Sequence, residues 1–280
     1  MKTKFIFLFL FLIQTSIFSQ TLIKFRNGYL WGYQDAITKR TLIPAKFGYA
    51  EDFKGGLAVV AEGASSPGQA QQLRIINIKG AYITDSVVYG SIINLGSGLV
   101  AVTSPASEYG HSNGIVVFGN NIFGIIDKTG KTILPIEYSK INDISEGLIV
   151  VVKENQFGII DLTGRFIVPL QSDFTIFNFK YGVAKIRRNA ADGFQDGLMD
   201  KTGKIMLDPG TSKLTIESDF NKFYIAEIRK NNLYGLINSS GKIIVEPIYS
   251  RSSGFTDRGV TYYKDNEHIG VKFDGSGKKY

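Results

Sequence analysis

The chain has 280 residues, of which 44% are hydrophobic and 12% aromatic, and its formal net charge is +7. It contains no cysteine and only two histidines, His111 and His268. Disulfides, thiolate metal sites, cysteine nucleophiles and three-histidine metal centres are therefore excluded. The hydrophobic fraction is sufficient for a packed core and argues against disorder. We expect neither a cofactor nor a metal.

The first segment has the pattern of an export signal. Lys2 and Lys4 precede an unbroken apolar run at 5–13, and the small residue Ser19 follows a more polar stretch. The run is shorter than the roughly 20 residues that cross a membrane comfortably, although an uncleaved anchor is the alternative. We predict that residues 1–19 are a signal peptide, and that the mature protein is periplasmic or extracellular with no membrane span.

Residues 20–280 are built from one motif repeated along the chain, which we predict to form a single domain. Each clear copy has a glycine, an Asp or Asn three residues later, and a second glycine three residues after that; these copies lie at 123–131, 157–165, 196–204 and 234–242. Degenerate copies lie at 31–38 and 73–80, and a last one with an extra residue lies at 269–277. Such periodicity indicates a repeat architecture.

The second half of the motif predicts short strands. Apolar residues lead to a proline at Pro44, Pro135, Pro169 and Pro247, and runs of the Gly-Leu-Val type follow at 56–60, 98–102, 147–151 and 182–186. The Asp-x-x-Gly segments predict tight turns, and the β-branched runs predict strands. Links such as Glu154-Asn155 and Asn231-Asn232 predict hairpin turns. Each repeat is therefore expected to be an antiparallel meander of three or four strands.

The motif resembles the WG-repeat family, with Trp31-Gly32, Phe123-Gly124, Phe157-Gly158 and Tyr234-Gly235 at its start. The resemblance covers 22–280, as about six full copies plus a partial C-terminal copy, although tryptophan is kept only at Trp31. The family resemblance implies a binding or scaffolding array and assigns no activity.

Each repeat is too small to bury its own apolar face and must stack on its neighbours, and two all-β arrangements allow this. One is a β-propeller-like ring of small blades, and the other is an open superhelical β-repeat array. The ring hides the terminal edges, whereas the open array needs caps. We favour the propeller-like ring and keep the open array as the alternative.

Insertions into the regular pattern supply the candidate binding residues, because loops on a rigid scaffold often carry function. They lie at 61–72, 103–113 and 188–195. The second insertion brings together Glu108, Tyr109 and His111, which favour an exposed loop over an acid–base site because no nucleophile accompanies them. Tyr262 and Tyr263, and the phenylalanines of 174–179, are the other candidates for a partner surface.

The repeated polar and aromatic positions have structural interpretations beside functional ones. The repeated aspartates (Asp35, Asp127, Asp161 and Asp200) offer one carboxylate per turn, which favours turn capping over calcium binding. The aromatic residues that open each motif favour a packing layer between repeats over a sugar-stacking row. No spacing singles out a carboxylate pair such as Asp143 and Glu146 for glycoside hydrolysis.

These observations predict an exported, non-enzymatic repeat scaffold that binds a protein or cell-envelope polymer, and no nucleic acid. An exported hydrolase of glycosidase type on a propeller-like scaffold is the alternative, and a structural envelope component is a third interpretation.

Overall fold

The computed structural model describes residues 21–63, 73–84, 89–103, 110–112, 115–117, 122–191 and 193–272. In this part of the chain the structure is almost entirely antiparallel β-sheet, with one four-residue helix, α1 (Pro209–Ser212). The predicted signal peptide lies outside the described residues. No described helix has the length and apolar character that a membrane crossing requires. The all-β class and the short antiparallel meanders are confirmed.

Six sheets follow one another along the chain, and we number them in that order. Sheet 1 contains β1 (Leu22–Asn27), β2 (Leu30–Asp35), β3 (Thr41–Ala50), β4 (Leu57–Glu62) and β5 (Leu73–Asn77). Sheet 2 has the order β11-β10-β7-β6, with β6 (Ile92–Gly96), β7 (Leu99–Thr103), β10 (Phe123–Asp127) and β11 (Thr132–Tyr138). A separate hairpin, β8 (Gly110–Ser112) and β9 (Ile115–Val117), stands between β7 and β10.

The later sheets pair their strands in chain order. Sheet 3 contains β12 (Lys140–Ile141), β13 (Leu148–Lys153), β14 (Gln156–Asp161) and β15 (Phe166–Gln171). Sheet 4 contains β16 (Thr175–Lys180), β17 (Val183–Ala190), β18 (Gly193–Asp200) and β19 (Ile205–Leu207). Sheet 5 contains β20 (Thr215–Ile216), β21 (Ile225–Lys230), β22 (Leu233–Asn238) and β23 (Ile243–Tyr249). Sheet 6 contains β24 (Arg251–Ser252), β25 (Gly259–Lys264) and β26 (Glu267–Lys272).

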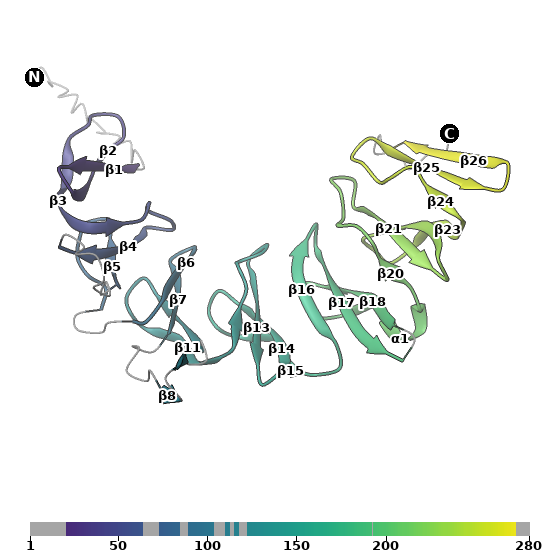
Figure 1. Cartoon of the computed structure of the whole chain (residues 1–280), viewed down its shortest axis with the longest axis horizontal. Coiled ribbons are helices and arrows are strands. Elements are labelled where there is room, and N and C mark those ends of the chain that lie inside the picture. Colours follow the sequence, from purple (N-terminus) through teal and green to yellow (C-terminus); the bar gives the residue numbers. More distant parts are fainter. Residues whose placement is uncertain are drawn as a thin grey trace, which may run out of the picture.

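The sheets form an open arc, with sheets 1 and 6 apart at its two ends (Figure 1). Of the two predicted arrangements, the open array therefore fits the described chain, and the favoured ring is not closed. No described sheet combines strands from both ends of the chain, so no strand pairing joins the two ends. In sheet 2, β6 lies nearest the hollow of the arc and β11 on its outer side, and in sheet 3, β15 lies on the outer side (Figure 1).

Each inner sheet is buried on both faces, which explains why its strands are continuous apolar runs rather than alternating ones. In β13, Ile149 and Val151 pack with sheet 2, whereas Leu148 and Val150 pack with sheet 4. Clusters of the same kind lie at the other junctions between consecutive sheets. A further cluster lies within sheet 1, among residues of β1 to β5. The core is thus a series of clusters along the stack, as expected for a repeat protein.

The Asp-x-x-Gly segments form the predicted turns. The Oδ1 atom of Asp161 accepts hydrogen bonds from the amides of Thr163 (2.9 Å) and Arg165 (3.0 Å) and from the Thr163 hydroxyl (2.6 Å). Asp127 and Asp200 bind their own turns in the same way, as does Asn238. These carboxylates cap turns, as their single occurrence per turn predicts.

Two glycines explain why the motif keeps its spacing. Gly164 has a φ of +86°, and a Cβ there would lie 2.8 Å from the Ile133 carbonyl oxygen of the preceding sheet. Gly235 has no such backbone requirement, but a Cβ would lie 2.5 Å from the Val245 carbonyl oxygen of the neighbouring, bulged strand. The first motif glycine therefore allows close approach within a sheet, and the second allows a turn to stack on the previous sheet.

The aromatic residues that open the motif are half-buried packing residues. Trp31, Phe123, Phe157 and Tyr234 each pack against one of the core clusters. The packing interpretation therefore describes their positions better than an exposed row of rings.

Candidate functional site

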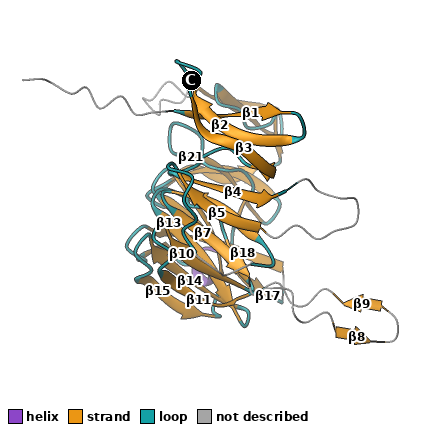
Figure 2. Cartoon of the chain, turned by 90° about the vertical axis from the view of Figure 1, so that its left-hand side faces the viewer, coloured by secondary structure: helices purple, strands orange, loops and turns teal. Residues whose placement is uncertain are grey.

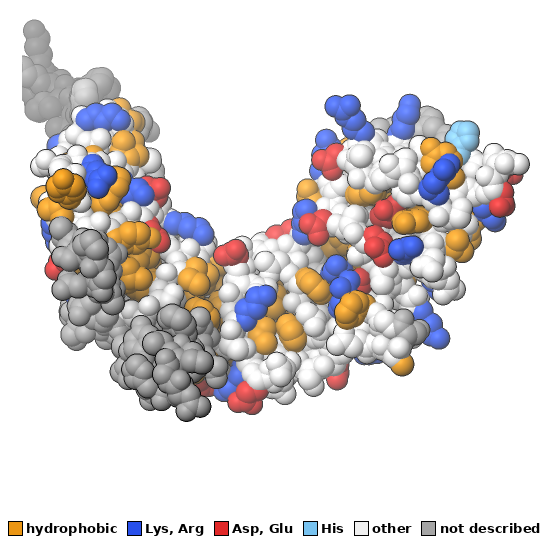
Figure 3. Space-filling model, in the orientation of Figure 1, with side chains coloured by type: hydrophobic (Ala, Val, Ile, Leu, Met, Phe, Trp, Pro, Cys, Tyr) orange, Lys and Arg blue, Asp and Glu red, His pale blue; other side chains and the backbone are white. Residues whose placement is uncertain are grey.

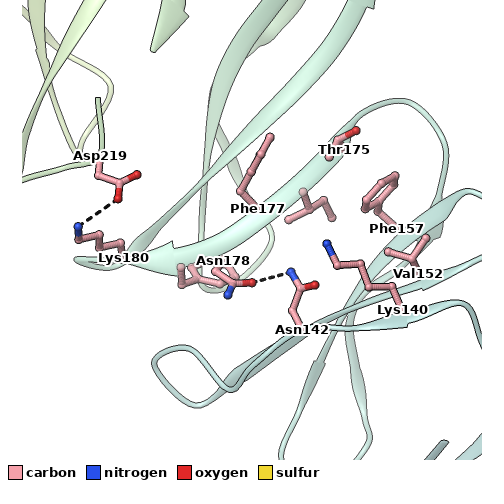
Figure 4. Close-up of a pocket in the computed structure, with 11 residues that line it drawn as sticks. Lys140, Asn142, Val152, Phe157, Thr175, Phe177, Asn178, Lys180 and Asp219 are labelled. Atoms are coloured by element: carbon pink, nitrogen blue, oxygen red, sulfur yellow. Dashed lines mark hydrogen bonds and ion pairs between the residues drawn. The ribbon is translucent and has the colours of Figure 1, made fainter. Parts of the chain in front are cut away.

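A groove of about 420 Å³ lies between sheets 3 and 4 (Figure 4). Its walls come from β12, β13 and β14 on one side and from β16 on the other, and Asp219, from the link between β20 and β21, reaches one end. The lining combines lysines, amides and aromatic rings, a mixture suited to holding an extended polar chain.

Polar contacts join the two walls of the groove. The Nδ2 of Asn142 donates a hydrogen bond to the Oδ1 of Asn178 at 2.7 Å (Figure 4). Beside it, the Ser145 hydroxyl donates to the Phe179 carbonyl oxygen. Glu146 accepts a hydrogen bond from the Gly182 amide at 3.0 Å. These contacts fix the separation of the sheets, so the groove is preformed.

The charged side chains along the groove form weak ion pairs or none within the described part of the chain. Lys180 approaches Asp219 at 3.3 Å, but the two side chains remain 51% and 84% exposed, so water weakens the pair. Lys140 is exposed and has no ion-pair partner within the described part of the chain. A ligand carrying a carboxylate therefore finds at least one ammonium group without an internal competitor.

Two phenylalanines give the groove an apolar component. Phe157 is half-buried against the cluster between sheets 3 and 4, and Phe177 lies on β16. In Figure 4, Phe177 and Asn178 leave β16 in different directions, yet both line the groove, because a bulge between Ile176 and Phe179 interrupts the strand alternation. Of the phenylalanines at 174–179, Phe174 and Phe179 are buried in the core, although Phe179 also borders the groove. Phe177 is the more exposed of the two rings from this run that line it.

Among the described carboxyl groups with a clearly displaced pKa, every displacement is downward. The Thr163 hydroxyl and the neighbouring Arg165 hold the pKa of Asp161 at about 2. The pKa values of Asp127 and Asp200 are lowered chiefly by the hydroxyls of Thr129 and Thr202. Burial opposes ionisation of Glu146, but hydrogen bonds from Lys201 and the Gly182 amide outweigh it and lower its pKa. These groups are stabilised as anions.

The residues predicted as a partner surface are not brought together. Glu108 and Tyr109 lie outside the described residues, and only the backbone of His111 is described, in β8. Tyr263 lies half-buried in β25, beside His268 and under the Arg251 guanidinium. In the described part of the chain, no three His, Asp or Glu side chains form a metal-binding group.

Tyr262 requires a correction, because it is fully buried and belongs to no surface. Strand alternation turns it towards sheet 5, where its hydroxyl donates to Glu227 Oε1 at 3.0 Å and to the Gly235 carbonyl oxygen at 3.2 Å. Burial, with the nearby Glu227 carboxylate, raises the pKa of Tyr262.

Sequence reasoning missed the two asparagines of the groove. Asn142 and Asn178 lie 36 residues apart, each four or five residues before the third motif glycine of its copy. Asn94 occupies the same place before Gly98, so the recurring asparagine was a signal that could have found them. Of the residues that the sequence analysis did single out, the phenylalanines at 174–179 pointed to this region.

Comparison with known proteins identifies the repeat. The model of the WG containing repeat matches residues 31–63, 123–156, 157–190 and 234–267. No curated protein matches the sequence. The four matched segments lie in sheets 1, 2 and 3, in the β16–β17 region of sheet 4, and in sheets 5 and 6.

Several solved structures resemble the chain distantly. A eukaryotic initiation factor is 12% identical with a TM-score of 0.47, over 93% of this chain and 72% of that one. Hsv2 of Kluyveromyces lactis is 10% identical with a TM-score of 0.37, over 92% and 93%. Prolyl oligopeptidase B of Galerina marginata is 11% identical with a TM-score of 0.36, over 93% and 50%. At these scores the resemblances assign no function to this chain.

Proposed function

We propose that this chain, which carries WG repeats in four segments, is a non-enzymatic scaffold that binds a protein or cell-envelope partner. The observation that carries the proposal is the preformed groove between sheets 3 and 4, with its fixed amide pair and its uncommitted lysine. Rigid walls with unused polar groups favour binding, because little ordering is required when a ligand arrives.

An extended polypeptide segment is the partner that best suits the groove. β16 is the first strand of sheet 4, so one of its edges has no strand partner within the sheet. It has six residues and β6 of sheet 2 has five, whereas β12, β20 and β24 at the corresponding place have two each. A longer unpaired edge beside a groove offers backbone groups to an added strand, although the bulge in β16 limits the length that can pair.

The carboxyl groups favour a binding role over hydrolysis. A general acid for glycoside hydrolysis needs a raised pKa, whereas the clearly displaced carboxyl pKa values in the described chain are lowered. Asp219, the carboxylate at the groove, is exposed and paired with Lys180. Turnover of any member of a panel of glycans and peptides by the purified chain would contradict the non-enzymatic proposal.

Export is the second part of the proposal, and it rests on the charged and apolar pattern of residues 1–19. Mass spectrometry of the protein isolated from its native cells tests it. We expect the mature N-terminus near Gln20, in the periplasmic or extracellular fraction. An intact Met1 in the cytoplasmic fraction contradicts it.

Capture from an envelope extract tests the groove itself. The wild-type chain and a Lys140→Glu, Asn178→Ala variant serve as baits, and the partner is then purified and titrated against both. We expect saturable binding to the wild type and at least a tenfold weaker affinity for the variant, because a charge is reversed and the amide contact is lost.

The matched control is Lys128→Glu, Asn94→Ala, which makes the same changes away from the groove. Equal loss of binding in both variants would assign the partner to another surface, and a partner that shows no saturation would contradict binding altogether. Unchanged circular dichroism and urea midpoints establish that each bait is folded.

A further inference from the structure

One side of the arc collects the hairpins that join the two central strands of each repeat. The turns at Glu154-Asn155 and Asn231-Asn232, both with positive φ, belong to this set. The predicted insertions fall in the equivalent connections, between β4 and β5, between β7 and β10, and between β17 and β18. We call this side the hairpin face, and the β8–β9 hairpin lies on it with the β17–β18 end of sheet 4 (Figure 2).

Cations stacked on aromatic rings occur near this face in several of the sheets. In sheet 1, the Arg26 guanidinium lies 5.2 Å from the Trp31 ring centroid. In sheet 5, the Arg229 guanidinium lies 5.1 Å from Tyr234. Both are direct cross-strand pairs, one step inside the hairpin turn. The arrangement is therefore a repeated feature of the motif and not an isolated contact.

Sheets 4 and 6 continue the row with different ring partners. Lys185 lies 4.7 Å from the Phe177 ring, and the Arg251 guanidinium lies 4.3 Å from Tyr263. Figure 3, which views the hairpin face, shows basic side chains beside apolar ones at intervals along the arc. Among the described residues, such pairs occur in sheet 1 and in the consecutive sheets 4 to 6, and none occurs in sheets 2 and 3. Lys185 lies at mid-strand, opposite Leu198 of β18.

Several of these cations have no internal counter-ion. Within the described residues, Arg26, Lys185, Arg229 and Arg251 form no ion pair, whereas Arg187 is neutralised by Asp196. The Nε of Arg229 is buried without a hydrogen-bond partner in the described structure. A ring holds a cation in place but does not neutralise it, so the charge remains for an anionic ligand.

We propose that the hairpin face binds an acidic polysaccharide along sheets 4 to 6, with one carboxylate-bearing sugar at each of these three sheets. Stacked sheets lie about 10 Å apart, so the cations are sparse. Duplex DNA carries one charge per roughly 1.7 Å, a density that this row does not match. Carboxylates spaced by sugar rings suit it better, and half-exposed rings beside the cations add stacking surface. This surface shares Phe177 with the groove, but the cations that define it do not line the groove, so it is tested independently of the groove's partner.

The test uses the full chain with polygalacturonate as the probe. We expect saturable binding that weakens as salt rises, because counter-ions compete for the same cations. The variant Lys185→Gln, Arg229→Gln, Arg251→Gln should lose about tenfold or more in affinity, since each exposed pair adds a modest increment. Its salt dependence should also become shallower.

The matched control is Lys131→Gln, Lys204→Gln, Lys242→Gln, which removes the same charge from exposed lysines at the Asp-x-x-Gly turns, at the opposite ends of the strands. We expect it to bind polygalacturonate within about twofold of the wild type. Equal loss in both variants, or no binding by the wild type, would overturn the proposal. Tighter binding of duplex DNA than of polygalacturonate would also overturn it. If the triple variant unfolds, Arg251→Gln alone, at an exposed position, repeats the test with a smaller expected loss.

Discussion

Sheets 3 and 4 are neighbours with the same strand order, yet they differ at the residue that precedes the first motif glycine. In sheet 3 this residue is Phe157, half-buried against the core. In sheet 4 it is Asp196, whose exposed fraction is 0%. The Asp196 carboxylate accepts two hydrogen bonds from Arg187, at 2.6 and 2.9 Å, and one from the Ile216 amide at 2.8 Å.

The chain around Asp196 is adapted to this charge. β19 has three residues where β15 has six, and α1 follows, with Asp208 as its N-cap. The segment after α1 returns over Asp196, whose amide donates to the Leu214 carbonyl oxygen at 2.7 Å. The comparison teaches that the repeat accepts a buried charge at its aromatic position when an adjoining segment supplies the hydrogen bonds.

Removing that charge is expected to produce the largest effect on stability. Asp196→Ala leaves Arg187 and the Ile216 amide without their partner, and we expect it to lower the free energy of unfolding by about 3 kcal/mol. Phe157→Ala at the equivalent position should cost about 2 kcal/mol, because the ring is only half-buried. Urea unfolding of both variants makes the comparison.

A double variant sharpens the result. Arg187→Met, Asp196→Leu removes both charges together, so we expect it to be more stable than Asp196→Ala alone. If Asp196→Ala costs less than Phe157→Ala, the ion pair is not what organises sheet 4 at this position.

The next largest effect is expected at the turn glycines of sheets 3 and 4, Gly164 and Gly203, where substitution by alanine should cost different amounts of stability. A Cβ on Gly164 would lie 2.8 Å from a backbone oxygen, whereas a Cβ on Gly203 would meet mainly the Val168 side chain, at 2.7 Å. Side chains yield more easily than backbone, so we expect Gly164→Ala to cost about 3 kcal/mol and Gly203→Ala about 2 kcal/mol.

Gly147→Ala is the control, because Gly147 has a φ of +85° with open space around it. It should show the conformational cost alone, about 1 kcal/mol, by urea unfolding. Equal costs at all three glycines would mean that contact with the preceding sheet contributes nothing.

The turns, hairpins and strands were predictable because their signals are local. An Asp-x-x-Gly turn is specified within five residues, and Asn231-Asn232 specifies its hairpin alone. Whether the array closes depends instead on small rotations between successive sheets, which no residue pattern records. The open arc therefore had to come from the structure.

The candidate site was less predictable, for two physical reasons. The Asn142–Asn178 contact joins neighbouring repeats, and the recurrence of asparagine before the third motif glycine does not by itself say which two side chains meet. Tyr262 and Tyr263 are adjacent, so they face opposite sides of their sheet. In an inner sheet both faces are buried, but in the terminal sheet 6 one face is free, so the choice of face decides which tyrosine is buried. Counting back from the hairpin turn gives the phase: Tyr262 lies three residues before Asp265, as Val151 lies three residues before Glu154. Val151 faces the preceding sheet, so this comparison would have placed Tyr262 in the core.

Acid should weaken the turns of sheets 2, 3 and 4, which use aspartates, and not the turn of sheet 5, which uses Asn238. Because the pKa values of Asp127, Asp161 and Asp200 are lowered by folding, their contribution to stability is present above the ordinary carboxylate pKa of about 3.9. It is lost as the pH falls from there through the folded value, which is about 2 for Asp161. The wild type should therefore lose stability between about pH 4 and pH 2.

Replacing all three aspartates by asparagine keeps the turn acceptor, as Asn238 shows, but removes the titration. We expect the triple variant to have a flatter dependence of its urea midpoint on pH over that range. A dependence as steep as that of the wild type would assign the acid sensitivity to other carboxylates.

The smallest effect is expected at the second ion pair of sheet 4, Lys180 with Asp219. It differs from Arg187–Asp196 in exposure, since Asp219 is 84% exposed and Lys180 is 51% exposed. Water screens their attraction, and holding two mobile side chains together costs entropy, so Asp219→Asn should change the free energy of unfolding by less than about 0.5 kcal/mol. The measurement also bears on the groove. A pair worth little to folding leaves Lys180 free to bind a partner's carboxylate, whereas a loss above about 1 kcal/mol would commit that lysine to the fold and remove it from the proposed site.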